Sequence, residues 1–316
     1  MDHGTVQAAL KRPRLQRAAH VAGAVLCVLA LVLLVRRGVA LGDSLGAELR
    51  RIPLAGFALA LAAYVVGGLL LAFAWSTLVR IGSSAPLRRT PLIVGHLRSQ
   101  LAKYLPGNVF HLAWRHFAAR REGAGHRALA LALALETVLL LAGAAILALG
   151  VVSDPRIDAL APWARGLVWT APLLALVAWI GIGVVGRRAG HERLAPRRTA
   201  APLATVFVLD LVFFAAASLS LRLLCAQPDA LPLSAWCGWL ALAWAVGYVT
   251  PGAPAGLGLR EAVLALGLAP VLGAAPALAL ALAYRLVTVV ADALLALAGF
   301  AVLRDTLSRD PVEASP

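Results

Sequence analysis

KYLPGN, at residues 103–108, and YVTPGAPAG, at residues 248–256, are proline-glycine breaks inside otherwise apolar segments of this chain. Each break has a tyrosine shortly before Pro-Gly, and each leads to an arginine, Arg115 or Arg260. A broken helix at membrane depth leaves backbone groups without partners, which lipid cannot supply. Such breaks line cavities, and in transporters built from two repeats they mark the binding site. The sequence therefore predicts a membrane protein whose site lies at these two breaks.

The composition favours a chain that crosses the membrane many times. Of its 316 residues, 61% are hydrophobic and 14% are charged, whereas soluble proteins average about 25% charged residues. We therefore expect an all-α membrane helix bundle of seven or eight spans with two re-entrant segments, related as an inverted repeat. Seven apolar runs come close to or exceed the roughly 20 residues that a span needs: 18–35, 52–79, 128–152, 167–186, 202–224, 233–250 and 275–303. An eighth run, 257–272, is shorter and either crosses or dips into the membrane.

The expected organisation is a single integral-membrane domain, 18–303, with a polar tail at each end. The tail at 1–17 is basic and the tail at 304–316 is polar. Within the domain, the first break occupies 92–120 and the second occupies 248–268. Because arginines flank the first span on both sides, we expect it to be a retained anchor rather than a cleaved signal peptide.

We attribute the formal net charge of +14 to basic loops expected on the cytoplasmic side of the membrane. Lysines and arginines cluster in the N-terminal tail and in the connections 80–127 and 187–198, which the positive-inside rule would place in the cytoplasm. The connection at 36–51, with four arginines, departs from this pattern. Basic loops also attract anionic lipid headgroups. We therefore expect a cytoplasmic N-terminus and membrane lipids as partners, and no binding of nucleic acid.

The first break has an unusual composition. Asn108 is the only asparagine in the chain, and Lys103, nearby, is one of two lysines. Asparagine tolerates left-handed backbone and offers both a donor and an acceptor. A helix-break-helix that enters the membrane from the cytoplasmic side fits residues 92–120, and a pair of amphipathic helices lying on the surface is the alternative.

Ionisable and polar residues near the breaks are the candidates for a binding site, because charges inside spans are expensive and tend to mark function. The alternative is that these charges only neutralise one another inside the bundle, which we favour for Asp210 and Arg222. The candidate binding residues are Lys103, Tyr104, Asn108, Arg115, Glu136, Tyr248, Arg260, Glu261, Arg285 and Asp292. The breaks themselves are built from Pro106, Gly107, Pro251, Gly252, Pro254, Gly256 and Gly258.

Spacing allows some of these charges to meet. Arg285 and Asp292 are seven residues apart and therefore share a helix face. Glu136 lies early in the span after the first break, and we expect it to reach either Arg115 or Arg285.

Other chemistries find little support in the sequence. The chain has no His-Glu-x-x-His, no Gly-x-Ser-x-Gly and no P-loop. The histidines around the first break lack metal-ligand spacing, and we expect them to face lipid headgroups or to be satisfied internally. The three cysteines all lie in apolar segments, where a thiol behaves as a small hydrophobic group. We expect no metal and no cofactor.

The motifs together resemble the lysylphosphatidylglycerol synthase transmembrane, or flippase-like, domain family of bacterial membrane proteins. The resemblance covers about two-thirds of the chain. It rests on KYLPGN (103–108) followed by Arg115, on Glu136, on PGAPAGLGLRE at 251–261, and on Arg285-Leu286-Val287 with Asp292 in the last expected helix. The resemblance implies a multi-pass protein of the bacterial inner membrane that handles lipids. The full synthase also has a soluble aminoacyl-transferase domain, which we do not expect in this chain.

The resemblance and the breaks favour a transporter over an enzyme. We expect translocation between leaflets of an anionic or aminoacylated phospholipid, or of a polyprenyl-linked or glycosylated lipid. Two alternatives stay open: an accessory membrane subunit of a lipid- or glycan-modifying synthase or transferase, and an intramembrane transferase. Assembly into a homo-oligomer stays open as well.

Overall fold

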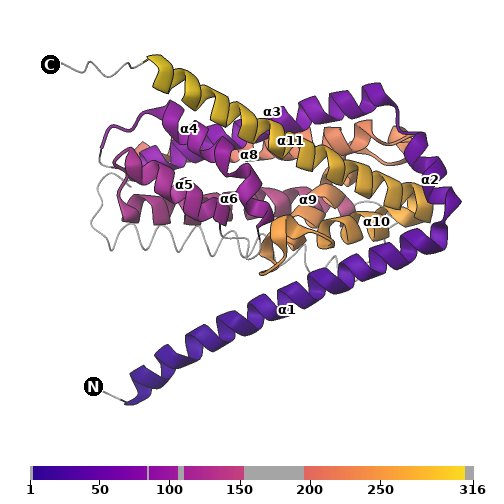
Figure 1. The fold of residues 1–316 in the computed structure, drawn as a ribbon, viewed down its shortest axis with the longest axis horizontal. Helices are drawn as coiled ribbons and strands as arrows, with labels where there is room; N and C mark the ends of the chain where they lie inside the picture. The colour runs from indigo at the N-terminus through magenta and orange to yellow at the C-terminus, as the bar shows by residue number, and fades with distance from the viewer. Residues whose placement is uncertain (1–2, 84, 106–109, 153–195, 310–316) are drawn as a thin grey trace.

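The computed structural model describes residues 3–83, 85–105, 110–152 and 196–309 (Figure 1). Every regular element in these ranges is a helix, which confirms the expected all-α class. The helices are α1 (His3–Leu41), α2 (Asp43–Arg50), α3 (Leu54–Gly82), α4 (Arg89–Arg98), the 3-10 helix η1 (Ser99–Tyr104), α5 (Phe110–Arg121), α6 (His126–Val152), α8 (Pro196–Leu223), the 3-10 helix η3 (Pro228–Ala230), α9 (Leu233–Val249), the 3-10 helix η4 (Pro254–Gly256), α10 (Leu259–Leu272) and α11 (Ala274–Arg309).

Six helical segments within the described ranges are long and apolar enough to cross a membrane. They are Ala24–Leu41, Leu54–Gly82, His126–Val151, Thr199–Leu223, Pro254–Leu272 and Ala274–Val302. Each corresponds to a span expected from the sequence, and the fifth is the short eighth run. The expected span at 233–250 is α9, an apolar helix of 17 residues, and the expected span at 167–186 lies outside the described residues.

The helices continue further than the charges suggested. Helix α1 runs through Arg36 and Arg37 to Leu41, where a connection was expected, and α11 continues to Arg309. Arginine is a good helix former, and its long side chain can carry the charge toward water while the stem lies along apolar surface. A charged end of a span therefore does not have to end the helix.

The bundle is held together by close helix–helix contacts. Helix α3 lies along α8, and α6 lies along α9. A Cβ atom built on Gly238 of α9 would lie 2.7 Å from the backbone nitrogen of Val151 in α6, and one built on Gly150 would overlap the carbonyl of Ser234. Without a hydrophobic driving force between spans, small residues of this kind let helix backbones approach each other.

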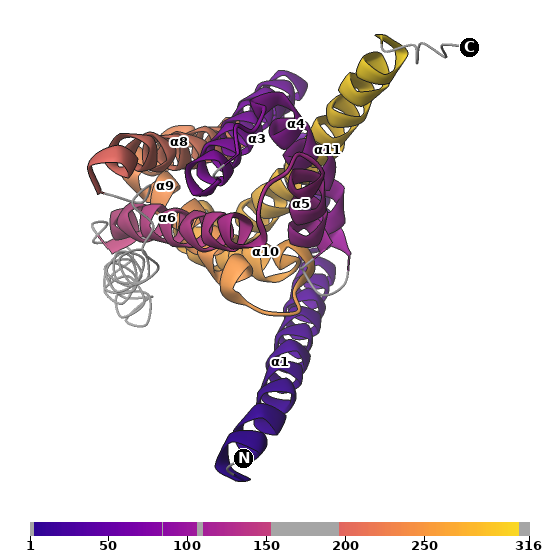
Figure 2. The same cartoon turned by 90° about the vertical axis from the view of Figure 1, so that its left-hand side faces the viewer.

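Helix α1 stands apart from the rest of the bundle. Figure 2 shows it leading away from the other helices, while the C-terminal end of α11 leaves on a different side. Most of its described large apolar side chains are exposed, including Val25, Leu29 and Leu33, as suits a helix in lipid. Among its described residues, Cys27 and Ala30 are buried, and Cys27 Sγ donates to the carbonyl of Leu257, 3.1 Å away, beside the second break.

The second break is a true interruption of helix. Helix α9 ends at Val249, and α10 begins at Leu259. The chain between them takes positive φ at Gly252, Gly256 and Gly258, with φ values of 85°, 68° and 80°, which glycine adopts without steric cost. At the first break, Pro106, Gly107 and Asn108 lie outside the described residues. The re-entrant path and the inverted repeat stay predictions.

Candidate functional site

Glu261 connects the second break to α11. Its Oε2 accepts a hydrogen bond of 2.6 Å from the backbone N–H of Gly258, which caps the start of α10. Its Oε1 forms an ion pair of 3.3 Å with Arg285 Nε, and Arg285 Nη1 also donates to the carbonyl of Ala255 at 3.2 Å. One carboxylate thus fixes both the local turn and an arginine from a different helix.

Asp292, two turns further along α11, binds two residues of the first break. Its Oδ1 accepts from Lys103 Nζ at 2.7 Å, and its Oδ2 accepts from the hydroxyl of Tyr104 at 2.6 Å. The residue is 1% exposed. The guanidinium of Arg285 lies 5.4 Å from the centre of the Tyr104 ring, within the range of a cation–π contact. Helix α11 therefore carries the residues that bind both broken segments.

The two breaks also contact each other directly, because η1 packs against η4. Arg285 lies over the ring of Tyr104, and Arg260 lies against Gly256 of η4, so cationic side chains from three parts of the sequence form one cluster. We call this the break cluster: Lys103, Tyr104, Arg260, Glu261, Arg285 and Asp292.

Arg260 is the member of the break cluster without a carboxylate partner. Within the described residues it forms no ion pair, and its Nε is buried without a hydrogen-bond partner. Its guanidinium lies 5.7 Å from the centre of the Trp244 ring. Its side chain passes between two glycines: a Cβ on either Gly247 or Gly256 would lie 2.6 Å from it. Glycine at both positions leaves the space that the arginine occupies.

Tyr248 supports this arrangement from α9. Its ring stacks on Trp244 with centroids 4.7 Å apart and an interplanar angle of 13°. Its hydroxyl lies 3.0 Å from Thr137 Oγ1 of α6. The stacked ring of Tyr248 therefore holds the ring of Trp244 next to Arg260, and the hydrogen bond to Thr137 holds Tyr248 in place.

The charges of the break cluster do not balance. Three cationic side chains, from Lys103, Arg260 and Arg285, face the two carboxylates of Glu261 and Asp292. Arg285 Nη2 is also buried without a hydrogen-bond partner among the described residues. Buried donors are normally satisfied, so an anion that accepted from these guanidinium groups would complete the cluster.

A second charged group lies apart from the break cluster. Arg115 of α5 donates to both oxygens of Glu136, from Nη1 at 2.7 Å and from Nη2 at 3.0 Å. Nη1 also lies 3.1 Å from His96 Nδ1, and the guanidinium lies 4.4 Å from the centre of the Trp75 ring. Of the two partners expected for Glu136, Arg115 is the one that binds it, whereas Arg285 pairs with Glu261.

Several participants were not among the candidates from the sequence. Trp75, His96 and Trp244 contact the charged residues, and Thr137 contacts Tyr248. The charges of Asp292, Arg260 and Arg285 act electrostatically on Tyr64. One clue was available: the chain has only 4 tyrosines. Two of these were recognised beside the breaks. The other two, Tyr64 and Tyr284, lie edge to face with ring centroids 6.1 Å apart.

The ion pair of Arg222 lies apart from the candidate residues. Arg222 Nη2 pairs with Asp229 Oδ1 at 2.7 Å, and Arg222 Nε donates to the carbonyl of Pro228. Asp210, in contrast, has no ion-pair partner among the described residues. Within those residues, no three His, Cys, Asp or Glu side chains are placed to hold a metal ion.

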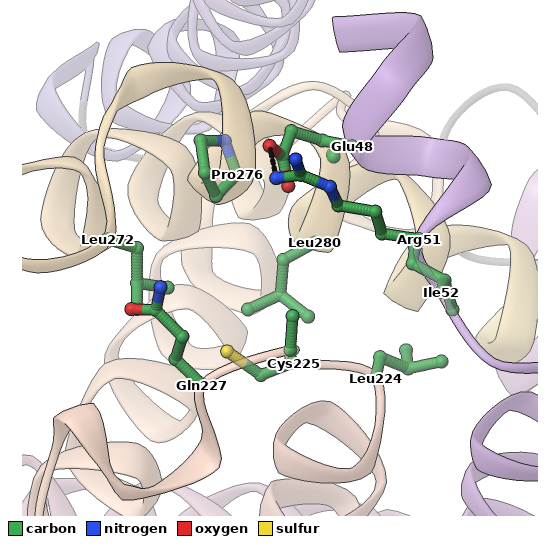
Figure 3. A pocket seen from close by; sticks show the side chains of 11 residues that line it. Glu48, Arg51, Ile52, Leu224, Cys225, Gln227, Leu272, Pro276 and Leu280 are labelled. Atoms are coloured by element: carbon green, nitrogen blue, oxygen red, sulfur yellow. Dashed lines mark hydrogen bonds and ion pairs between the residues drawn. The ribbon is translucent and has the colours of Figure 1, made fainter. Parts of the chain in front are cut away.

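A small cavity of about 80 Å³ lies away from the candidate residues, near α2 and the start of α11. Figure 3 shows the ion pair of Glu48 and Arg51 on one side of it and the side chains of Cys225 and Gln227 on another. None of the candidate binding residues lines this cavity.

No model of a known protein family matches the chain, and no curated protein matches it.

Proposed function

We propose that this protein moves a lipid with an anionic headgroup between the two leaflets of a membrane. Among the described residues, six helical segments are long and apolar enough to cross a bilayer, and they provide the membrane setting. The observation that carries the proposal is the break cluster, in which two interrupted segments and α11 bring five charged side chains together inside an apolar bundle. Charges at such depth are expensive and are retained where they bind substrate or ions.

The excess of positive charge favours an anionic substrate. A guanidinium binds a phosphate through two parallel hydrogen bonds. Arg260 has no competing carboxylate among the described residues, so a phosphate headgroup can bind it without first breaking an ion pair. Arg285 Nη2 supplies a second donor, while Glu261 and Ala255 hold the rest of that guanidinium in place.

The remaining members of the break cluster have a different role in the proposal. Asp292 is already bound by Lys103 and Tyr104, and it keeps the first break against α11. A lipid headgroup that carries an amine in addition to its phosphate can exchange with Lys103 for this carboxylate. The same cluster can thus accept simple anionic phospholipids and aminoacylated ones.

The resemblance to the flippase-like domain family supports the same class of substrate, which includes aminoacylated phospholipids and polyprenyl-linked or glycosylated lipids. Because the sequence has no P-loop, the proposed movement draws on the lipid gradient, the membrane potential or another ion. A polar path beside the breaks would lower the cost of carrying a headgroup across the apolar interior.

The test is lipid movement by the purified wild-type protein in proteoliposomes. A labelled anionic phospholipid and a labelled polyprenyl-phosphate glycolipid are placed in one leaflet, and their appearance in the other is compared with protein-free liposomes. The proposal predicts faster movement of at least one of them than of a labelled neutral lipid. No movement of either by monodisperse protein would overturn the proposal and would favour an accessory subunit that docks a synthase or transferase.

A further inference from the structure

Asp210 is a buried carboxylate that the proposed site does not use. It lies in α8, within the span Thr199–Leu223, and is 1% exposed. Its Oδ2 is buried without a hydrogen-bond partner, and no residue that the structure describes forms an ion pair with it. Other buried acids in the described helices have partners: Arg115 holds Glu136, and Lys103 holds Asp292.

The position of Asp210 is on the packed face of its helix. The residues one turn to either side, Val206 and Phe214, are buried as well, whereas Val208 and Val212 are exposed. The side chain therefore belongs to the interior of the bundle and not to the lipid-facing surface. An interior carboxylate without a partner is costly if it is charged.

The groups around Asp210 do not offset a negative charge. Helix α8 packs against α3, α6, α9 and α11. From α6, Glu136 acts electrostatically on Asp210, and its own charge is matched by Arg115. The buried face of α3 contributes the ionisable Tyr64, and α9 has no charged residue but carries Tyr248 and Cys237.

The two charged residues of α11 within the span Ala274–Val302 are also engaged elsewhere. Asp292 is bound by Lys103, and Arg285 is bound by Glu261. Ionisation of Asp210 would therefore add a second carboxylate charge that acts on Glu136, whose own charge is already matched by Arg115. The neutral, proton-carrying acid is the form that fits this environment.

We propose that Asp210 is a proton-binding site inside the membrane, and that its proton is exchanged when the Arg115–Glu136 pair rearranges. In the observed arrangement Arg115 serves Glu136, and Asp210 holds the proton. If Arg115 leaves Glu136, Glu136 takes up a proton and no longer repels a charge on Asp210, which then releases its own proton. The net charge of the three groups is the same in both arrangements.

The second step of the inference rests on the proposed function. An anionic headgroup that passes near Arg115 would compete with Glu136 for the guanidinium, and the displaced acid would then bind a proton. Lipid movement would in this way be coupled to a proton gradient, which can supply a driving force in a chain whose sequence lacks a P-loop.

Infrared spectroscopy of the purified protein tests the proton site without any transport. At neutral pH the wild type should show the carbonyl stretch of a protonated carboxyl, shifted on exchange into heavy water. Asp210→Asn should lack this band, whereas Glu122→Gln, a substitution in the turn after α5, should keep it. A wild type without the band, or a band that survives Asp210→Asn in monodisperse protein, would overturn the proton site.

The coupling has a separate test in proteoliposomes. A pH gradient imposed across the membrane should speed lipid movement by the wild type, and a protonophore or the variant Asp210→Asn should remove that acceleration. A rate of lipid movement that is the same with and without the pH gradient would overturn the coupling. The proton site would then still be decided by the infrared result. Absence of any lipid movement would count against the proposed function and not against Asp210 as a proton site.

Discussion

Lys103 and Asp292 are 189 residues apart in the sequence, yet Nζ of the lysine lies 2.7 Å from Oδ1 of the aspartate. The neighbouring Tyr104 binds the other carboxylate oxygen. One lysine of only two in the chain thus fixes the first break to the last span. This pair is one of the contacts that hold the first break against α11, and its removal should reduce both stability and function.

Truncation of Asp292 should destabilise the protein strongly. Asp292→Ala leaves the ammonium of Lys103 buried without a counter-charge, and breaking a buried pair from one side costs about 3–5 kcal/mol. The double variant Lys103→Met/Asp292→Ala, which removes both charges, should recover much of that loss. Thermal unfolding of the wild type, both single variants and the double variant in detergent measures the coupling. Additive losses in the double variant would show that the pair is not coupled.

Glu261 has two roles that glutamine and alanine should separate. Glu261→Gln retains an oxygen to accept from the N–H of Gly258, since glutamine also forms a capping box, but it removes the charge facing Arg285. Glu261→Ala loses the cap as well, at a further cost of about 1 kcal/mol. We expect the unfolding temperature to decrease from the wild type to Glu261→Gln and again to Glu261→Ala. Equal unfolding temperatures for the two variants would mean that the cap contributes nothing.

Gly256 should tolerate no side chain. A Cβ there would lie 2.6 Å from Arg260 Nε and 2.9 Å from Gly247 Cα, in addition to the strain of positive φ, which costs roughly 1–2 kcal/mol for an L-residue. Gly256→Ala should therefore displace Arg260 and abolish lipid movement. Gly123→Ala is a matched control, because Gly123 also has positive φ, at 93°, with nothing within 4 Å of its Cβ position. Transport by Gly256→Ala at the wild-type rate would contradict this account of Arg260.

The His116–His126 pair should make stability depend on pH. The rings lie with Nε2 of His116 3.0 Å from Nδ1 of His126. Partial burial, followed by the charges of His126 and Arg120, lowers the pKa of His116 from its ordinary value of 6.5. The folded state then favours the neutral ring, so the stability from this group is present above about pH 6.5 and is lost as the pH falls through the lowered pKa.

Unfolding temperatures of the wild type and His116→Gln at a series of pH values check this. The wild type should lose stability on acidification more steeply than the variant, because only the wild type gains a proton at this position on unfolding. Parallel pH profiles for the two proteins would contradict the assignment.

The sequence predicted the all-α class and the positions of the described spans well, because long uncharged apolar runs are typical of helices that cross a membrane. It also anticipated the pairing of Glu136 with Arg115 as one of two options, because their segments are consecutive along the chain. Where a helix ends was harder to predict, as α1 shows by continuing through Arg36 and Arg37. The arginines there carry charge without breaking the helix.

The pairing of Lys103 with Asp292 could not be predicted from the sequence. Spans that are apolar around their whole circumference give no hydrophobic stripe from which to read the face that packs inward. The partner of a charge then depends on which helices are neighbours, and that depends on close contacts such as the one between Gly238 and Val151. The aromatic support of Arg260 by Trp244 was missed for the same reason.

Arg260 offers the most direct test of the account. Lipid movement in proteoliposomes is measured for Arg260→Ala beside Arg222→Ala, an arginine in the same chain whose partners are Asp229 and Pro228 and not the break cluster. The account predicts that Arg260→Ala loses the movement of the anionic lipid while Arg222→Ala retains it, with both proteins monodisperse. Equal movement by Arg260→Ala and the wild type would contradict a headgroup path at the second break.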